Sequence, residues 1–199
     1  MTDNQNIYSD SELWSSFIAG DKEAFSILYR LSYKKLYSYG ISLGMDNDQI
    51  RDIIQDLFVK LFEKPELIKE TSTIAPFLFV SMRNAFINNQ KIKERYPNLN
   101  NMETFDVKYI TETDTIGNQE DEMHIKQRVD EIMNILSPRQ KEIIYLRFLH
   151  QMEYEEIASI MNLSEQAARN LTHRAIKKMR DNNLNQTFFI LISLLIIYK

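Results

Sequence analysis

The segment LSEQAARNLTHRAIKKMR, residues 163–180, concentrates cations in a chain whose net charge is −4. It holds five lysines and arginines and only one acid. At about 100° per residue, Ala168, Leu171, Ala175 and Met179 fall on one side of a helix. Amides and cations occupy the other side, where amides can pair with base edges and cations with guanine or phosphate. We therefore predict a DNA-contacting helix whose candidate residues are Ser164, Gln166, Arg169, Asn170, His173, Arg174 and Lys177.

Enzyme chemistry is disfavoured by the types and spacing of the remaining residues. The histidines His124, His150 and His173 are scattered, and there is no HExxH motif, glycine-rich phosphate loop or nucleophile elbow. The chain has no cysteine, which excludes disulfides, thiolate zinc sites and a cysteine nucleophile. We expect a non-enzymatic protein with no catalytic residues, no metal and no cofactor.

Two short helices joined by a tight turn would present the basic face. One is predicted over about 154–161, after which Asn162 tolerates the turn and Ser164 caps the basic helix. An earlier helix starts at Ser137-Pro138, where Gln140 can complete a capping box. This arrangement predicts a helix-turn-helix, and the alternative is an ordinary solvated amphipathic helix.

The first half of the chain also has a helical pattern, from about residue 10 to 96. Apolar residues recur at steps of three and four, as one helical face requires: Ala24, Phe25, Leu28, Leu31 and Leu36. A second helix is predicted over about 48–63, and a third after Thr71-Ser72-Thr73. With only four glycines and four prolines, the composition favours helices over sheet.

The periodicity fades over 97–120, and residues 103–122 hold seven acids against one base. Such a run reads as a linker. We therefore predict an all-α fold of two small helical domains, 10–96 and 121–182, joined by an acidic flexible linker. The C-terminal domain would be the helix-turn-helix.

The tail, 183–199, contains the apolar run FFILISLLIIY at 188–198. Eleven residues are too few for a membrane-spanning helix, which needs about 20. The tail could pack on the C-terminal domain, serve as a docking segment for a regulator, or make a weak membrane contact. The polar N-terminus does not read as a secretory signal, so we expect a cytoplasmic protein without obligatory membrane contact.

Four segments, taken in order, resemble the sigma-70 family and its compact extracytoplasmic-function (ECF) sigma factors. Three lie in the first half: GDKEAFSILYRLSYKKLYSYG, DIIQDLFVKLFE and FLFVSMRNAFINNQK. The fourth is LSPRQKEIIYLRFLHQMEYEEIASIMNLSEQAARNLTHRAIKKMR. The resemblance covers about residues 13–181. It implies a transcription initiation factor that binds core RNA polymerase, directs it to promoter DNA and helps open the −10 region. Relatives are often held inactive by an anti-sigma factor.

In this family the segment resembling DIIQDLFVKLFE docks on the polymerase clamp. From the helical spacing, the buried face would comprise Ile53, Ile54, Leu57, Phe58 and Leu61. The outward, polymerase-binding residues would be Asp52, Gln55, Asp56, Val59 and Glu63. An outward valine among acids is unusual for a surface that meets only water, although a solvated acidic face is the alternative.

The segment resembling FLFVSMRNAFINNQK implies capture of the −10 promoter element. Its candidate DNA-binding residues are Arg83, Asn84, Asn88, Lys91 and Lys93. Phe77, Phe79 and Phe86 could stack on bases, but phenylalanines at helical spacing are more often core residues.

The resemblance assigns the basic helix to the −35 promoter element. Many relatives carry a threonine-valine pair where this chain has Ala167-Ala168, so the base preference cannot be copied from them. The acidic total is consistent with a factor that polymerase carries to DNA, since the factor need not supply the nonspecific phosphate attraction itself. A stand-alone helix-turn-helix regulator that binds its operator without polymerase is the alternative function.

Overall fold

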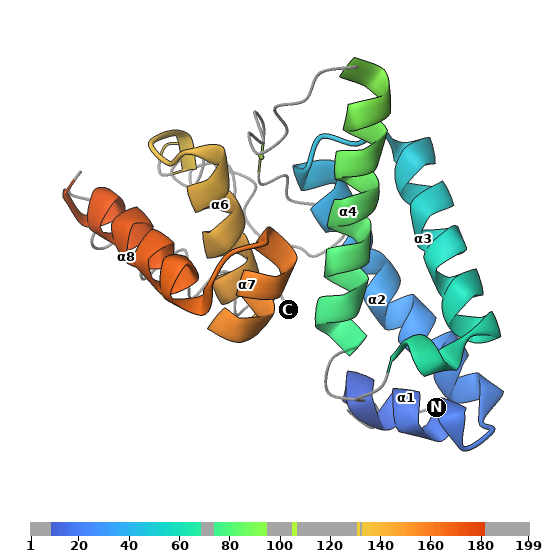
Figure 1. Ribbon diagram of the computed structural model, residues 1–199. Coiled ribbons are helices and arrows are strands. Elements are labelled where there is room, and N and C mark those ends of the chain that lie inside the picture. The colour runs from blue at the N-terminus through green and yellow to red at the C-terminus, as the bar shows by residue number, and fades with distance from the viewer. Residues whose placement is uncertain (1–8, 69–73, 95–104, 107–130, 132, 182–199) are drawn as a thin grey trace, which may run out of the picture. The chain divides into compact units, whose positions relative to one another are not determined.

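The computed structural model describes residues 9–68, 74–94, 105–106, 131 and 133–181 (Figure 1). These residues form helices, and none of them lies in a β-strand. The all-helical expectation is therefore confirmed for the described part of the chain. The chain divides into two compact units, which lie mainly before and after the Arg95–Tyr96 junction. The predicted domain bounds stay predictions, because the residues around that junction lie outside the described ones.

The described residues of the first unit form α1 (Asp10–Ile18), α2 (Lys22–Ser42), α3 (Asn47–Glu63) and α4 (Ile74–Glu94). A short 3₁₀ turn, η1 (Pro65–Leu67), follows α3. Within this unit α2, α3 and α4 run alongside one another, and α1 lies across one end of them (Figure 1). The predicted helices over 48–63 and after 71–73 are confirmed, although the capping residues 71–73 lie outside the described residues.

Side-chain caps fix where two of these helices begin. Ser9 and Glu12 form a capping box at α1, and the hydrogen bond from the Ser9 amide lowers the pKa of the Glu12 carboxyl. Asp46 accepts a hydrogen bond from the Gln49 amide at the start of α3, 2.8 Å away. The sequence therefore specifies these starts locally, because each cap satisfies an amide that the helix leaves unbonded.

The core of the first unit follows most of the predicted apolar spacing on α2, although Phe25 is half-buried. Ala24, Leu28 and Leu36 on α2 are buried, as expected. Leu31 is instead 46% exposed, and the neighbouring Ser32 is 2% exposed. The side of α2 that packs against the other helices is thus rotated away from Leu31, which the periodicity alone could not resolve.

The second unit contains α6 (Pro138–Ile144), the π-helical turn η3 (Tyr145–Leu149), α7 (Tyr154–Met161) and α8 (Glu165–Asp181). The predicted capping box is confirmed, since Ser137 and Gln140 bond reciprocally ahead of Pro138. The turn between α7 and α8 spans residues 162–164, and Asn162 is left-handed with φ 52°. The predicted helix-turn-helix is therefore present, with α8 packed against both α6 and α7.

The sequence did not predict η3 or the turn that follows it. Gln151 adopts φ 54°, and Arg147 Nη1 donates to the Met152 carbonyl at 2.6 Å. Arg147 also pairs with Glu153 at 3.2 Å. One arginine thus bridges the turn that leads into α7, a contact that no periodic pattern encodes.

Of the predicted linker, only Phe105 and Asp106 are described. Phe105 is 2% exposed, and its ring centroid lies 5.5 Å from that of Tyr145 in an edge-to-face arrangement. Asp106 pairs with Lys141 at 3.4 Å. This apolar residue in an acidic run is therefore part of the second unit's packing rather than a solvated spacer. The remaining linker residues and the tail 183–199 lie outside the described residues.

Across the described helices, none is both long and apolar enough to cross a membrane.

At Gly40 the backbone of α2 lies close to the Ile50 side chain of α3. A Cβ atom at this position would lie 2.7 Å from Ile50 Cγ1, which is well inside van der Waals contact. We expect Gly40→Ala to lower the free energy of unfolding by about 1–3 kcal/mol, because overpacking outweighs the gain in helix propensity. Chemical denaturation followed by circular dichroism measures this. Ser26→Ala, at an exposed position on the same helix, is the control and should change little. A Gly40→Ala variant as stable as the parent would contradict the close approach.

Candidate nucleic-acid and partner interfaces

Helix α8 buries a narrow face of small side chains and exposes a polar one. Ala168 and Ala175 are 0% exposed, and Thr172 and Met179 are 1% exposed. Thr172 takes the buried place predicted for Leu171, which is half-buried. The threonine hydroxyl is satisfied, because Oγ1 donates to the Ala168 carbonyl at 3.1 Å. Sequence reasoning missed this position because a hydroxyl was counted as polar.

The seven residues predicted to face DNA are exposed on α8 and its cap. They are Ser164, Gln166, Arg169, Asn170, His173, Arg174 and Lys177. Ser164 Oγ accepts from the Ala167 amide at 3.2 Å and so acts as the predicted cap. Because the recognition helix of a helix-turn-helix contacts bases with its N-terminal residues, the exposed face is chemically suited to a DNA groove.

Two side-chain pairs order the N-terminal part of this face. Gln166 Nε2 donates to Asn170 Oδ1 at 3.1 Å. Arg169 Nε donates to Glu165 Oε1 at 3.0 Å, and its guanidinium carbon lies 4.5 Å from the centroid of the Tyr154 ring. Glu165 and Tyr154 were not among the predicted site residues, since their roles depend on contacts with Arg169 that only the fold creates.

The candidate −10 residues on α4 have different surroundings. Asn84 and Asn88 are exposed and lie four residues apart, so they share one side of the helix. Arg83 is only 7% exposed and interacts within the protein. The side chains of Lys91 and Lys93 lie outside the described residues. The structure thus brings together Asn84 and Asn88 on an exposed side, and it places Arg83 toward the core.

The phenylalanines of α4 are mostly core residues. Phe79 and Phe86 are 2% and 7% exposed, and the Phe79 ring centroid lies 4.9 Å from that of Tyr39. Phe77 is half-buried. The core interpretation of Phe79 and Phe86 therefore agrees with their burial, and neither ring is available for stacking in this conformation.

The predicted polymerase-binding residues of α3 are all exposed: Asp52, Gln55, Asp56, Val59 and Glu63. Ile54, Leu57, Phe58 and Leu61 are buried behind them, whereas Ile53 is half-buried. The helical spacing thus separated the buried and exposed sides of α3 correctly apart from the partial exposure of Ile53.

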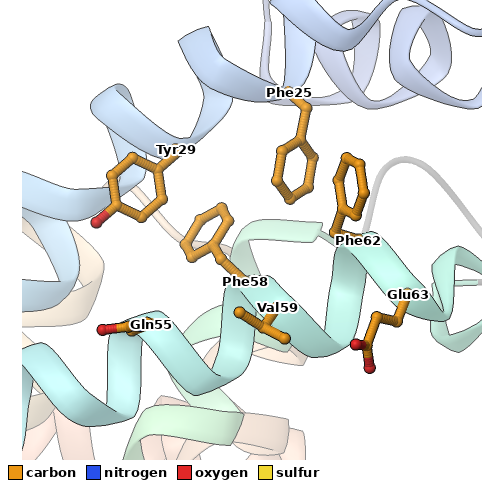
Figure 2. A pocket seen from close by; sticks show the side chains of 7 residues that line it. All are labelled: Phe25, Tyr29, Gln55, Phe58, Val59, Phe62 and Glu63. Atoms are coloured by element: carbon orange, nitrogen blue, oxygen red, sulfur yellow. The ribbon is translucent and has the colours of Figure 1, made fainter.

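Helices α2 and α3 enclose an apolar groove of about 370 Å³. It is lined by Phe25, Tyr29, Gln55, Phe58, Val59, Phe62 and Glu63 (Figure 2). Figure 2 shows the rings of Phe25 and Tyr29 directed from α2 toward those of Phe58 and Phe62 on α3. Val59 and Phe62 are each 47% exposed, so large apolar side chains of the groove are accessible from outside.

Ring–ring contacts hold the groove in shape. Phe25 lies 5.4 Å from Phe62 and 5.8 Å from Phe58, and Tyr29 lies 4.9 Å from Phe58. Sequence reasoning missed Phe25, Tyr29 and Phe62 as site residues. The sequence does contain a pair of aromatic residues four positions apart on each helix. When each helix is considered alone, such a pair is assigned to the core.

No group of three or more potential ligands for a metal ion occurs among the residues that the structure describes.

The comparisons with known proteins agree with this geometry. Residues 126–179 match the family described as "Sigma-70, region 4", and this range includes α6, α7 and all but the last two residues of α8. The chain is 24% identical over 170 residues to the ECF RNA polymerase sigma factor SigX of Bacillus subtilis, covering 80% of this chain and 83% of that protein. It carries a sigma-70 region 4 domain and is a distant homologue of the ECF sigma factors.

Two further relatives support this assignment. The ECF sigma factor SigM of Bacillus subtilis is 22% identical, covering 77% of this chain and 91% of the relative. The ECF RNA polymerase sigma-E factor of Haemophilus influenzae is 25% identical, covering 88% and 95%. Sigma factors are not enzymes, in agreement with the expectation of a non-enzymatic protein.

A solved structure of CnrH in complex with the cytosolic domain of CnrY has a similar fold. Its TM-score is 0.54 at 18% sequence identity, and the match covers 86% of this chain and 95% of that one. These matches cover most of the chain, whereas the region 4 match covers residues 126–179 and does not include the α2–α3 groove.

Proposed function

We propose that the protein is a transcription initiation sigma factor that binds core RNA polymerase, directs it to promoters and helps open the −10 region. The observation that carries the proposal is the exposed amide and cationic face of α8 within a sigma-70 region 4 domain. Such a factor would act in the cytoplasm, where its polymerase and promoter DNA are found.

The α8 face would read the −35 element in the major groove. Gln166 and Asn170 form an amide pair, which keeps further donor and acceptor groups of both side chains for base edges. The cations Arg174 and Lys177 lie farther along the helix, where they would contact phosphates and fix its register. His173 is exposed, lies between Asn170 and Arg174 in the sequence, and would take part in the same DNA contact.

Helix α4 would capture the −10 element through Asn84 and Asn88, with Lys91 and Lys93 farther along the same helix. Amides can bond the exposed edges of unpaired bases, and lysines can pair with the strand's phosphates. Arg83 is left out of this proposed surface, because its side chain is almost fully buried.

The α2–α3 groove would receive the polymerase clamp. Val59 and Phe62 supply an apolar centre, and the exposed acids Asp52, Asp56 and Glu63 lie on the same helix. Interfaces of this kind combine an apolar centre with a polar rim. A clamp surface with an apolar side chain flanked by lysines or arginines would fit this groove. An anti-sigma partner could compete for the same groove.

Run-off transcription with purified core polymerase over genomic DNA tests the proposal. We expect discrete transcripts only when the full chain and core polymerase are both present. Binding of the chain alone to the same promoters should be weak at physiological salt, since the net charge is −4. Equal promoter binding with and without polymerase would instead identify a stand-alone regulator, and the absence of any complex with core enzyme would reject the sigma role.

Asn170→Ala should relax promoter selection at one base pair of the −35 element. The loss of one good base contact is expected to cost about 1–3 kcal/mol of discrimination. Run-off competition among promoters with single substitutions measures this. Arg180→Ala, an exposed position near the end of α8, is the control and should leave base selection unchanged. Undiminished selectivity in the Asn170 variant would contradict the groove-facing assignment.

Val59→Asp should weaken the complex with core polymerase at least tenfold, because it buries a charge in the apolar centre of the interface. Its stability should change little, since Val59 is already 47% exposed. The control is Lys60→Gln, an exposed neighbour that changes the net charge by the same amount. Fluorescence anisotropy with labelled protein measures the affinity. Equal affinities for the Val59 variant and the parent would remove the groove from the interface.

A further inference from the structure

Two arginines from different parts of the second unit contact the Tyr154 ring. The guanidinium carbon of Arg169 on α8 lies 4.5 Å from the ring centroid, and that of Arg147 lies 4.8 Å from it. Both distances are within the range of a cation–π contact. Tyr154 is the first residue of α7 and is half-buried, so its ring joins the turn before α7 to the recognition helix.

The ring is itself anchored on the side of Arg147. That guanidinium donates to the Met152 carbonyl at 2.6 Å and pairs with Glu153 at 3.2 Å. Only 27% of the Arg147 side chain is exposed. Since Arg147 is bonded to the turn and packed on the ring, Tyr154 has a fixed surface on which a second guanidinium can rest.

Arg169 is held from its other side by Glu165, one helical turn earlier on α8. Arg169 Nε donates to Glu165 Oε1 at 3.0 Å, and Nη2 bonds to the same oxygen. A guanidinium is planar, so bonds through Nε and the near side of Nη2 leave the outer edge of Nη1 and Nη2 directed away from the carboxylate. That outer edge has the paired donors that match guanine O6 and N7.

As an isolated surface ion pair, Glu165–Arg169 would contribute little to stability. The pair instead fixes the orientation of the Arg169 guanidinium. An exposed arginine loses rotamer freedom when it binds, and a guanidinium already fixed by a ring and a carboxylate loses less. Arg169 also stands in the N-terminal half of α8, where a recognition helix meets base edges.

We propose that Tyr154 and Glu165 are positioning residues that hold Arg169 so that its outer edge reads a guanine in the −35 element. This inference rests on the proposed sigma function. It assigns base specificity to two residues that do not themselves touch DNA, one of them outside the recognition helix.

The test compares Tyr154→Phe, which keeps the ring, with Tyr154→Leu, which keeps bulk but removes the π face. Each full-length variant is combined with core polymerase and assayed by run-off competition on promoters substituted at each −35 position. Arg169→Ala first identifies the base pair that Arg169 reads. At that position we expect Tyr154→Leu to reduce the preference for guanine about two- to fivefold, the size of an exposed cation–π contact. Tyr154→Phe should retain it.

A double-mutant cycle separates positioning from a structural role. If Tyr154 acts through Arg169, Tyr154→Leu should have no further effect on base preference in an Arg169→Ala background. Glu165→Gln, which removes the charge but keeps the shape, should reduce the same preference without changing preference at other positions. Thermal denaturation of each variant reports stability independently of base preference.

Two outcomes would overturn the inference. If Arg169→Ala weakened binding to every promoter equally, Arg169 would contact phosphate rather than a base. Additive effects of the Tyr154 and Arg169 changes would show that the tyrosine acts elsewhere. Either result would arise with an active parent protein, whereas failure of the sigma role itself would leave the parent chain inactive with polymerase.

Discussion

The close packing of α8 through Ala168 and Ala175 is the contact on which the recognition surface depends. Both side chains are fully buried, and α8 packs against α6 as well as α7. Methyl groups allow the helix axes to approach closely, so a narrow stripe is enough to fix the rotation of α8 about its axis. The wide remainder of its circumference stays exposed and carries the amides and cations. Larger residues in the stripe would shift the helix and redirect every exposed side chain.

The proposed interface of the first unit differs from the α8 surface because it is apolar. The rings of Phe25, Tyr29, Phe58 and Phe62 contact one another across α2 and α3, yet Val59 and Phe62 remain almost half exposed. Aromatic contacts support the groove from within, while part of its apolar surface remains exposed. The acids on the outer side of α3 keep this surface soluble and would repel nucleic acid. The α2–α3 groove of the first unit and the exposed face of α8 in the second thus have opposite chemical characters, one apolar with acids and the other amide and cationic.

The interactions of Arg169 show how a surface residue can be constrained without being buried. Its partners come from the start of α7 and the first turn of α8, and Arg147 links that arrangement to the preceding turn. Because the tight turn of Asn162 fixes α7 against α8, the geometry of the helix-turn-helix and the orientation of this arginine are coupled. Changes at the turn would therefore alter the orientation of Arg169 as well as stability.

The sequence by itself determined the helices, their caps and most of the division into buried and exposed faces. Local rules suffice for this: the Ser137–Gln140 capping box, the left-handed Asn162 and the period of α3 each depend on residues only a few positions apart. It also showed where amide and cationic side chains gather, because charge and amide content are properties of the residues themselves. Where it erred, the deciding partner was distant. Leu31 is exposed, Arg83 is buried and Thr172 replaces Leu171 in the packed stripe, since helix packing selects among faces that periodicity leaves nearly equivalent. Only the tertiary structure could assemble the groove from two helices, or bring Tyr154, Glu165 and Arg169 together, because a contact between elements depends on how their surfaces fit.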